Sequence, residues 1–194
     1  MTRIARVERI TNETKVTIEL DLDGAGASTV TTGVGMFDHV LTSLAHHGLF
    51  DLTVTTDGDL EIDDHHTVED TALVLGTAFA DALGDRAGIR RYGDAVVPMD
   101  EAIARCAVDV GGRPYAVLDI ATSGERIGNL TLQNVPHALE AFARTAGFTI
   151  HLEASGDNDH HVVEAAFKAL ARALRSAVEA DQRREGIPST KGTT

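Results

Sequence analysis

The sequence repeats itself. When the chain is shifted by 98 positions, segment 39–59 falls on segment 137–157, where His39 matches His137, Gly58-Asp59 matches Gly156-Asp157, and several apolar positions agree. The register then continues at a shift of 95, where Asp64-His65-His66 falls on Asp159-His160-His161 and Glu69 falls on Glu164. Agreement at both polar and apolar positions indicates a duplication, and a repeat of this length must be interpreted before any local pattern.

Each copy predicts the same kinds of element. Alternating apolar residues predict strands at 16–22, 50–56 and 148–154. Apolar residues spaced by three and four predict helices at 37–47, 65–84, 135–146 and 160–182, and Asp64 and Asp159 stand at the expected N-caps of the two long helices.

These elements predict an α+β fold of internally duplicated half-domains. We expect two mixed β-sheets with four helices packed between them, related by pseudo-twofold symmetry. The halves are predicted to be residues 1–92 and residues 93–194, the second including the C-terminal tail, and together they form one compact unit.

Charge and cysteine content exclude several classes of function. The formal net charge is −13, which argues against a nucleic-acid or anionic membrane surface, because both need a positive field. The single cysteine, Cys106, excludes an intrachain disulfide and a cysteine-based zinc site. Charged residues fill the first thirty positions, and no apolar run is long enough to span a bilayer, so we expect a cytoplasmic protein.

Six of the nine histidines lie at repeat-equivalent positions. On a helix, residues four apart project from one face, so His65 and Glu69 share a face, and so do His160 and Glu164. The neighbouring His66 and His161 are turned away by about 100°. Each long helix therefore offers a two-ligand face and one ligand that points elsewhere.

Pairing the two long helices gives two metal sites. One would combine His65 and Glu69 with His161, and the other His160 and Glu164 with His66, either within one chain or between subunits. His39 and His137 are the expected fourth ligands. Nitrogen and oxygen donors without thiolate favour Mn, Fe, Co, Ni or Zn over Mg or Ca. The predicted ligands are His39, His65, His66, Glu69, His137, His160, His161 and Glu164.

Basic residues in turns are candidate anion ligands in so acidic a chain. Arg91 and Arg113 stand in glycine-containing turns, and Lys168 lies four residues after Glu164. The tail 188–192, Pro-Ser-Thr-Lys-Gly, combines two hydroxyls with a lysine, a composition suited to phosphate.

Together these motifs resemble the imidazoleglycerol-phosphate dehydratase family over nearly the whole chain. The resemblance rests on Phe37-Asp38-His39, the block 63–70 (DDHHTVED), the block 98–102 (PMDEA), the block 112–115 (GRPY), the block 158–161 (NDHH) with Glu164, and the tail 188–192. The paired His-His blocks are highly specific, and the arginine and tail motifs gain weight beside them.

The resemblance implies an activity and an assembly. The family removes water from imidazole glycerol phosphate to give imidazole acetol phosphate in histidine biosynthesis. It implies two Mn²⁺ per active site, with other divalent transition metals as alternatives, and a homo-oligomer of 24 subunits with active sites between subunits. The substrate contacts that it implies are Glu13, His39, Arg91, Arg113, Lys168, Ser189, Thr190 and Lys191.

We expect the catalytic residues to be Glu13, Glu164, His65 and His160. The metals would act as Lewis acids and a template, and Glu13 and Glu164 are the candidates for proton transfer, with Asp100 and Glu101 as alternatives. Two other functions also fit these residues. A dinuclear hydrolase of phosphate esters would release inorganic phosphate, whereas a dehydratase does not. A metal-storage or metal-assembled shell would not need the basic residues.

Overall fold

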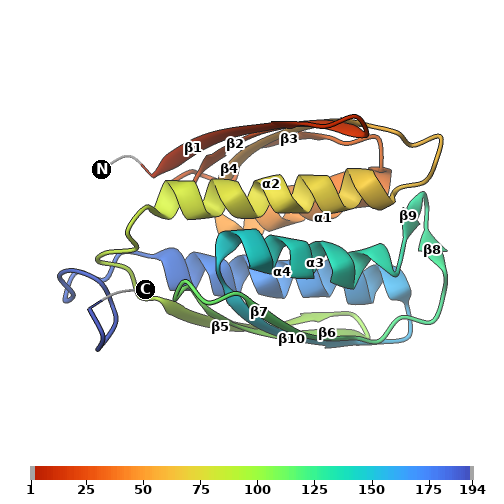
Figure 1. Cartoon of the computed structure of the whole chain (residues 1–194). Coiled ribbons are helices and arrows are strands. Elements are labelled where there is room, and N and C mark those ends of the chain that lie inside the picture. The colour runs from red at the N-terminus through yellow and green to blue at the C-terminus, as the bar shows by residue number, and fades with distance from the viewer. Residues whose placement is uncertain (1–2, 193–194) are drawn as a thin grey trace.

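The computed structural model describes residues 3–192 as three layers, in which four helices lie between two β-sheets (Figure 1). The first half contains β1 (Ile4–Ile10), β2 (Thr14–Asp21), β3 (Ser28–Thr31), α1 (Gly35–Gly48), β4 (Asp51–Gly58) and α2 (His65–Leu83). The second contains β5 (Tyr92–Met99), β6 (Ala102–Asp109), β7 (Tyr115–Ile120), the hairpin β8 (Arg126–Ile127) and β9 (Leu130–Thr131), α3 (Asn134–Ala146), β10 (Thr149–Ser155) and α4 (Asp159–Val178).

The two four-stranded sheets have the same topology. Their strand orders are β1-β2-β4-β3 and β5-β6-β10-β7. In each sheet the last pair, β3 with β4 or β7 with β10, is parallel, and the other pairs are antiparallel. The α+β prediction with two mixed sheets and four helices between them is confirmed. The predicted boundary between residues 92 and 93 falls at the start of β5, and the division into half-domains stays a prediction.

Sequence alternation explains which face of each sheet is covered. In β2, Val16, Ile18 and Leu20 are buried, while the intervening side chains face away from the helices. Four phenylalanines join the layers. Phe79 of α2 packs edge-to-face on Phe50, Phe142 and Phe148, with ring centroids 5.2, 5.3 and 6.2 Å away. The core therefore runs continuously from one half into the other.

Three local predictions need correction. The last helix ends at Val178 rather than at residue 182, because the backbone of residues 179–181 bonds instead to residues 88–90. Asn158, not Asp159, caps that helix and accepts the N–H of His160. Asp64 stands at the N-cap of α2 but makes no capping bond, because its carboxylate accepts hydrogen bonds from Thr131.

In the part of the chain that the structure describes, no helix combines the length and the apolar character needed to cross a membrane.

Candidate metal centre

The segment 123–134 bonds to the beginnings of the helices. The Asn129 side chain contacts the backbone of Gly33 and Gly35 at the start of α1. Asp64 at the start of α2 accepts from Thr131, and Asp159 at the start of α4 accepts the N–H groups of residues 123 and 124. Since α3 itself begins at residue 134, the first turns of all four helices meet at one end of the molecule (Figure 1). The predicted ligands lie within the first two turns of these helices.

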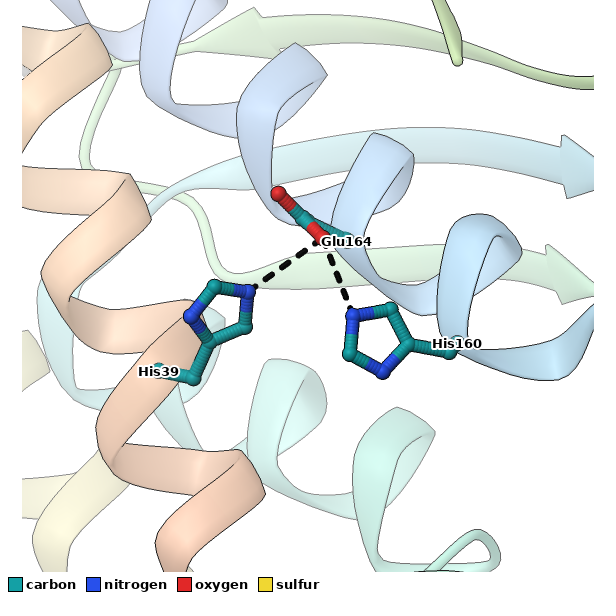
Figure 2. A group of neighbouring side chains, drawn as sticks. All are labelled: His39, His160 and Glu164. Carbon is teal, nitrogen blue, oxygen red and sulfur yellow. Dashed lines mark hydrogen bonds and ion pairs between the residues drawn. The ribbon is translucent and has the colours of Figure 1, made fainter. Parts of the chain in front are cut away.

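The first cluster combines residues of α1 and α4. His39 and His160 flank Glu164, and the Nε2 atom of each ring lies 3.2 Å from Glu164 Oε2 (Figure 2). The other oxygen of Glu164 accepts from Lys168 Nζ at 2.7 Å. Burial alone would raise the pKa of Glu164, but hydrogen bonds from Lys168 and His39 outweigh burial and lower this pKa to about 2. The carboxylate is therefore held in its charged form, ready to bind a cation.

The second cluster is the counterpart on α2 and α3. His65 Nε2 lies 3.5 Å from Glu69 Oε2, and His137 Nε2 lies 3.4 Å from Glu69 Oε1. The rings of His65 and His137 stack with centroids 4.8 Å apart. Arg144 also approaches Glu69, at 3.4 Å. Each cluster thus repeats the same set of two imidazoles and one carboxylate.

Both clusters fit a metal ion. In each, the three donor atoms lie within 4.8 Å of one another. His137 Nε2 is buried yet makes no hydrogen bond within residues 3–192, and a buried polar atom without a partner is costly unless something binds it. Imidazole nitrogen with carboxylate oxygen is a donor set for divalent transition metals.

His66 and His161 lie in neither cluster, so one chain does not bring them to the sites that the helix geometry suggested. His66 Nδ1 lies 3.0 Å from Asp59 Oδ2, and His161 Nδ1 lies 2.9 Å from Glu101 Oε2. The hydrogen bond to the carboxylate raises the pKa of each histidine, and the bond from His161 lowers the pKa of Glu101 to about 2.

The candidate phosphate ligands gather elsewhere, apart from Lys168. Arg91 donates to Asp109 at 2.7 Å and to the carbonyl of Pro188 at 2.8 Å, which holds the tail with Ser189, Thr190 and Lys191 nearby. The exposed Arg113 lies 3.9 Å from the same Asp109. The hydrogen bond with Asp109 raises the pKa of Arg91, so this arginine is firmly charged.

Sequence patterns missed several residues around the clusters. Asn134 Oδ1 lies 3.2 Å from His65 Nδ1, and Asp59 contacts His66. Asp64 and Asp159 were expected as caps but instead hold the segment 123–134. Asp100 and Glu101 were considered only as alternatives for proton transfer. In the structure both lie near His161, and Asp100 Oδ2 is 3.8 Å from its Nε2. The sequence repeat could have drawn attention to Asp64 and Asp159, which occupy matching positions, but it could not have shown that they bind the segment 123–134.

Comparison with known proteins agrees with this geometry. Residues 32–174 match the family model described as imidazoleglycerol-phosphate dehydratase. A protein of that name from Thermobifida fusca is 56% identical, over 100% of both chains. The solved structure of the enzyme from Staphylococcus aureus has a TM-score of 0.83 and 34% identity, and covers 92% of this chain and 99% of that one.

The solved structure from Pyrococcus furiosus, in complex with the compound (S)-C348, also has a TM-score of 0.83, with 33% identity over 97% of this chain and 100% of that one. The family model matches most of the chain, and sequence identity and fold agree with it over nearly the full length. This chain therefore belongs to the imidazoleglycerol-phosphate dehydratase family of lyases.

Proposed function

We propose that this protein dehydrates imidazole glycerol phosphate to imidazole acetol phosphate in histidine biosynthesis, using two Mn²⁺ per active site. The observation that carries the proposal is the pair of matched His-His-Glu clusters in a chain of this family. A bound metal would supply Lewis acidity and orient the substrate. A cytoplasmic location stays a prediction from the sequence.

Glu13 is the better of the two carboxylates for proton transfer. Both oxygens of Glu164 are occupied, one by Lys168 and the other by the two histidines of its cluster. Such a carboxylate suits a ligand. The side chain of Glu13 is 55% exposed, and its Oε1 lies 3.8 Å from His66 Nε2, too far for a hydrogen bond. It is therefore free to approach a substrate proton, whereas His65 and His160 would hold the metal.

The phosphate would be bound by a second subunit. Arg91 N–H donates to the carbonyl of Ala177, close to the end of α4, whereas His160 stands at its beginning. The helix between them is about 25 Å long at ~1.5 Å per residue. A small substrate cannot reach both, so we propose a site between subunits, in which Arg91, Arg113 and the tail 189–191 of one copy face the metal end of another.

The same arrangement accounts for His66 and His161. Each is close to the metal end of the chain but outside both clusters. We propose that, in the assembled protein, His66 and His161 of one subunit reach the clusters of a neighbouring subunit and complete their ligand sets. A homo-oligomer of 24 subunits, as the family resemblance implies, would supply such contacts by symmetry.

Metal removal tests the activity. Protein stripped by a chelator should form no ketone from imidazole glycerol phosphate, and added Mn²⁺ should restore turnover. His65→Ala and His160→Ala should then abolish it, and Glu13→Gln should slow it by about 10²- to 10⁴-fold while leaving bound Mn²⁺ unchanged. Two bound Mn²⁺ per chain without ketone would retain the metal site and remove the dehydratase proposal. Release of inorganic phosphate would instead indicate a phosphate-ester hydrolase.

A further inference from the structure

The two histidines outside the clusters share a local arrangement. His66 and His161 occupy the same repeat position, and in both rings Nδ1 faces a carboxylate at hydrogen-bond distance, from Asp59 and Glu101 respectively. In both, Nε2 faces the carboxylate of a hairpin turn at 3.8 Å, Glu13 between β1 and β2 or Asp100 between β5 and β6.

The two Nδ1 partners come from unrelated positions in the halves. Asp59 follows β4, and its repeat counterpart is Asp157 after β10. Yet the contact to His161 is made by Glu101, from the β5–β6 turn. Two different backbone positions thus supply the same bond to the same ring atom. A contact reached by two routes points to a requirement of the histidine rather than to a by-product of the duplicated backbone.

The carboxylate of Glu101 and the backbone of Asp59 are both held by further hydrogen bonds. The other oxygen of Glu101 accepts the N–H of Asn158 at 2.9 Å, which ties the β5–β6 turn to the cap of α4. The N–H of Asp59 donates to the carbonyl of Glu13 at 3.1 Å, which ties the end of β4 to the β1–β2 turn. A carboxylate that accepts from Nδ1–H sets the ring orientation and places the single proton of the neutral imidazole on Nδ1, which leaves the lone pair of Nε2 available to a metal.

We propose that Asp59 and Glu101 are positioning residues that fix the tautomer and orientation of His66 and His161, so that Nε2 of each ring is presented to a metal. This role rests on the proposed function, because it assumes that the two histidines are ligands. It also assigns Glu101 to orientation rather than to proton transfer.

The test compares full-length Asp59→Asn and Glu101→Gln with wild-type protein. Both substitutions keep the shape of the side chain but remove the negative charge that fixes the tautomer. We expect the Kd for Mn²⁺, measured by chelator competition, to rise by about 10- to 100-fold. The ¹⁵N spectra of histidine-labelled, metal-free protein should change from the tautomer protonated at Nδ1 to a mixture, while the metal-free Tm stays close to that of the wild type.

Asp157→Asn is the matched control, because Asp157 is the exposed repeat counterpart of Asp59. It should leave the Kd and the spectra unchanged. Wild-type affinity for Mn²⁺ and an unchanged tautomer in both test variants would overturn the inference. A weaker affinity accompanied by a large fall in the metal-free Tm would also overturn it, because the loss would then reflect a damaged fold. Wild-type protein that binds no Mn²⁺ would instead remove the proposed function itself.

Discussion

Single carboxylates organise loops in this protein through backbone N–H groups. Asp51 at the start of β4 accepts the N–H groups of Ala25 and Ala27 at 2.8 and 2.9 Å, which fixes the loop before β3. The bonds from Ala27 and Ala25 lower the pKa of Asp51 from its ordinary value of 3.8. A carboxyl group with a lowered pKa stabilises the folded state only while it is ionised in that state.

Asp51→Ala should therefore lower Tm at neutral pH and have less effect in acid. Because the folded pKa is lowered, the stabilisation is fully present above pH 3.8 and is lost as the pH falls through the folded value. Thermal melts of wild type and variant along a pH series measure the difference. Asp57→Ala, at an exposed position of the same strand, is the control and should change Tm little at any pH. If the difference in Tm between wild type and Asp51→Ala were the same in acid as at neutral pH, the proposed role of the ionised carboxylate would be wrong.

Residue patterns predicted the pairs within the two clusters better than the surroundings of the clusters. The His-His-x-x-Glu blocks are local, so helix geometry alone placed His65 beside Glu69 and His160 beside Glu164. The partner of each pair came from another helix, and its choice depended on packing that no spacing encodes. Asp64 illustrates the limit, since an aspartate before a helix is an expected cap, yet a backbone N–H far along the chain offers it a better partner.

At the scale of elements, close packing of α2 on α3 sets the second cluster. Gly76 of α2 lies against α3, and a Cβ there would stand 2.1 Å from Thr145 Oγ1 and 2.5 Å from the carbonyl of Phe142. Thr145 also donates to the carbonyl of Leu73 on α2, at 2.8 Å. The cluster residues Glu69 and His137 lie on this pair of helices, so the distance between them depends on the absence of a side chain at Gly76.

Gly76→Ala should destabilise the protein. Alanine is favoured over glycine inside a helix by about 1 kcal/mol, but overpacking of a rigid contact costs about 1–3 kcal/mol and forces the helices apart. We expect a net fall in stability in urea titration, and weaker Mn²⁺ binding. Gly35→Ala serves as the comparison, because a Cβ there would have only one neighbour, at 3.9 Å. Equal stability of the two variants would show that α2 and α3 adjust without cost.

The elements were only partly predictable from the sequence, which gave no range for β1, β3, β5, β6 or β7. The four helices and the strands β2, β4 and β10 follow apolar periodicity, so they were predicted within a few residues. The hairpin β8–β9 was not, because its two-residue strands have no period to detect. The end of α4 was placed too late because residues 179–182 contain no proline or glycine that would end a helix, whereas in the structure Ala180 pairs with Ile89.

At the scale of the whole molecule, the His-His-Glu clusters lie at the opposite end of α4 from Arg91. This separation predicts how activity changes when two inactive variants are assembled together. His65→Ala removes a proposed metal ligand, and Arg113→Ala removes a proposed phosphate contact, so each homogeneous variant should be nearly inactive. Co-assembled chains should regain activity, because some sites then combine intact metal ligands from one subunit with an intact arginine from another. Random mixing gives roughly a quarter of sites intact.

The measurement is the specific activity of co-expressed, doubly tagged assemblies against each variant alone. If both residues served the same site within one chain, no mixture could rebuild an intact site and activity would stay at the level of the parents. A mixture of His65→Ala with His65→Ala chains carrying different tags is the matched control and should remain inactive.

Neither half of the chain carries a whole cluster, since His39 joins two residues of the second half and His137 joins two residues of the first. A metal ion at either cluster would therefore act as a cross-link between residues far apart in the sequence, and would hold the two halves of the chain against each other. The halves do not use matching residues throughout, because Glu101 contacts His161, whereas Asp157 is the repeat counterpart of Asp59.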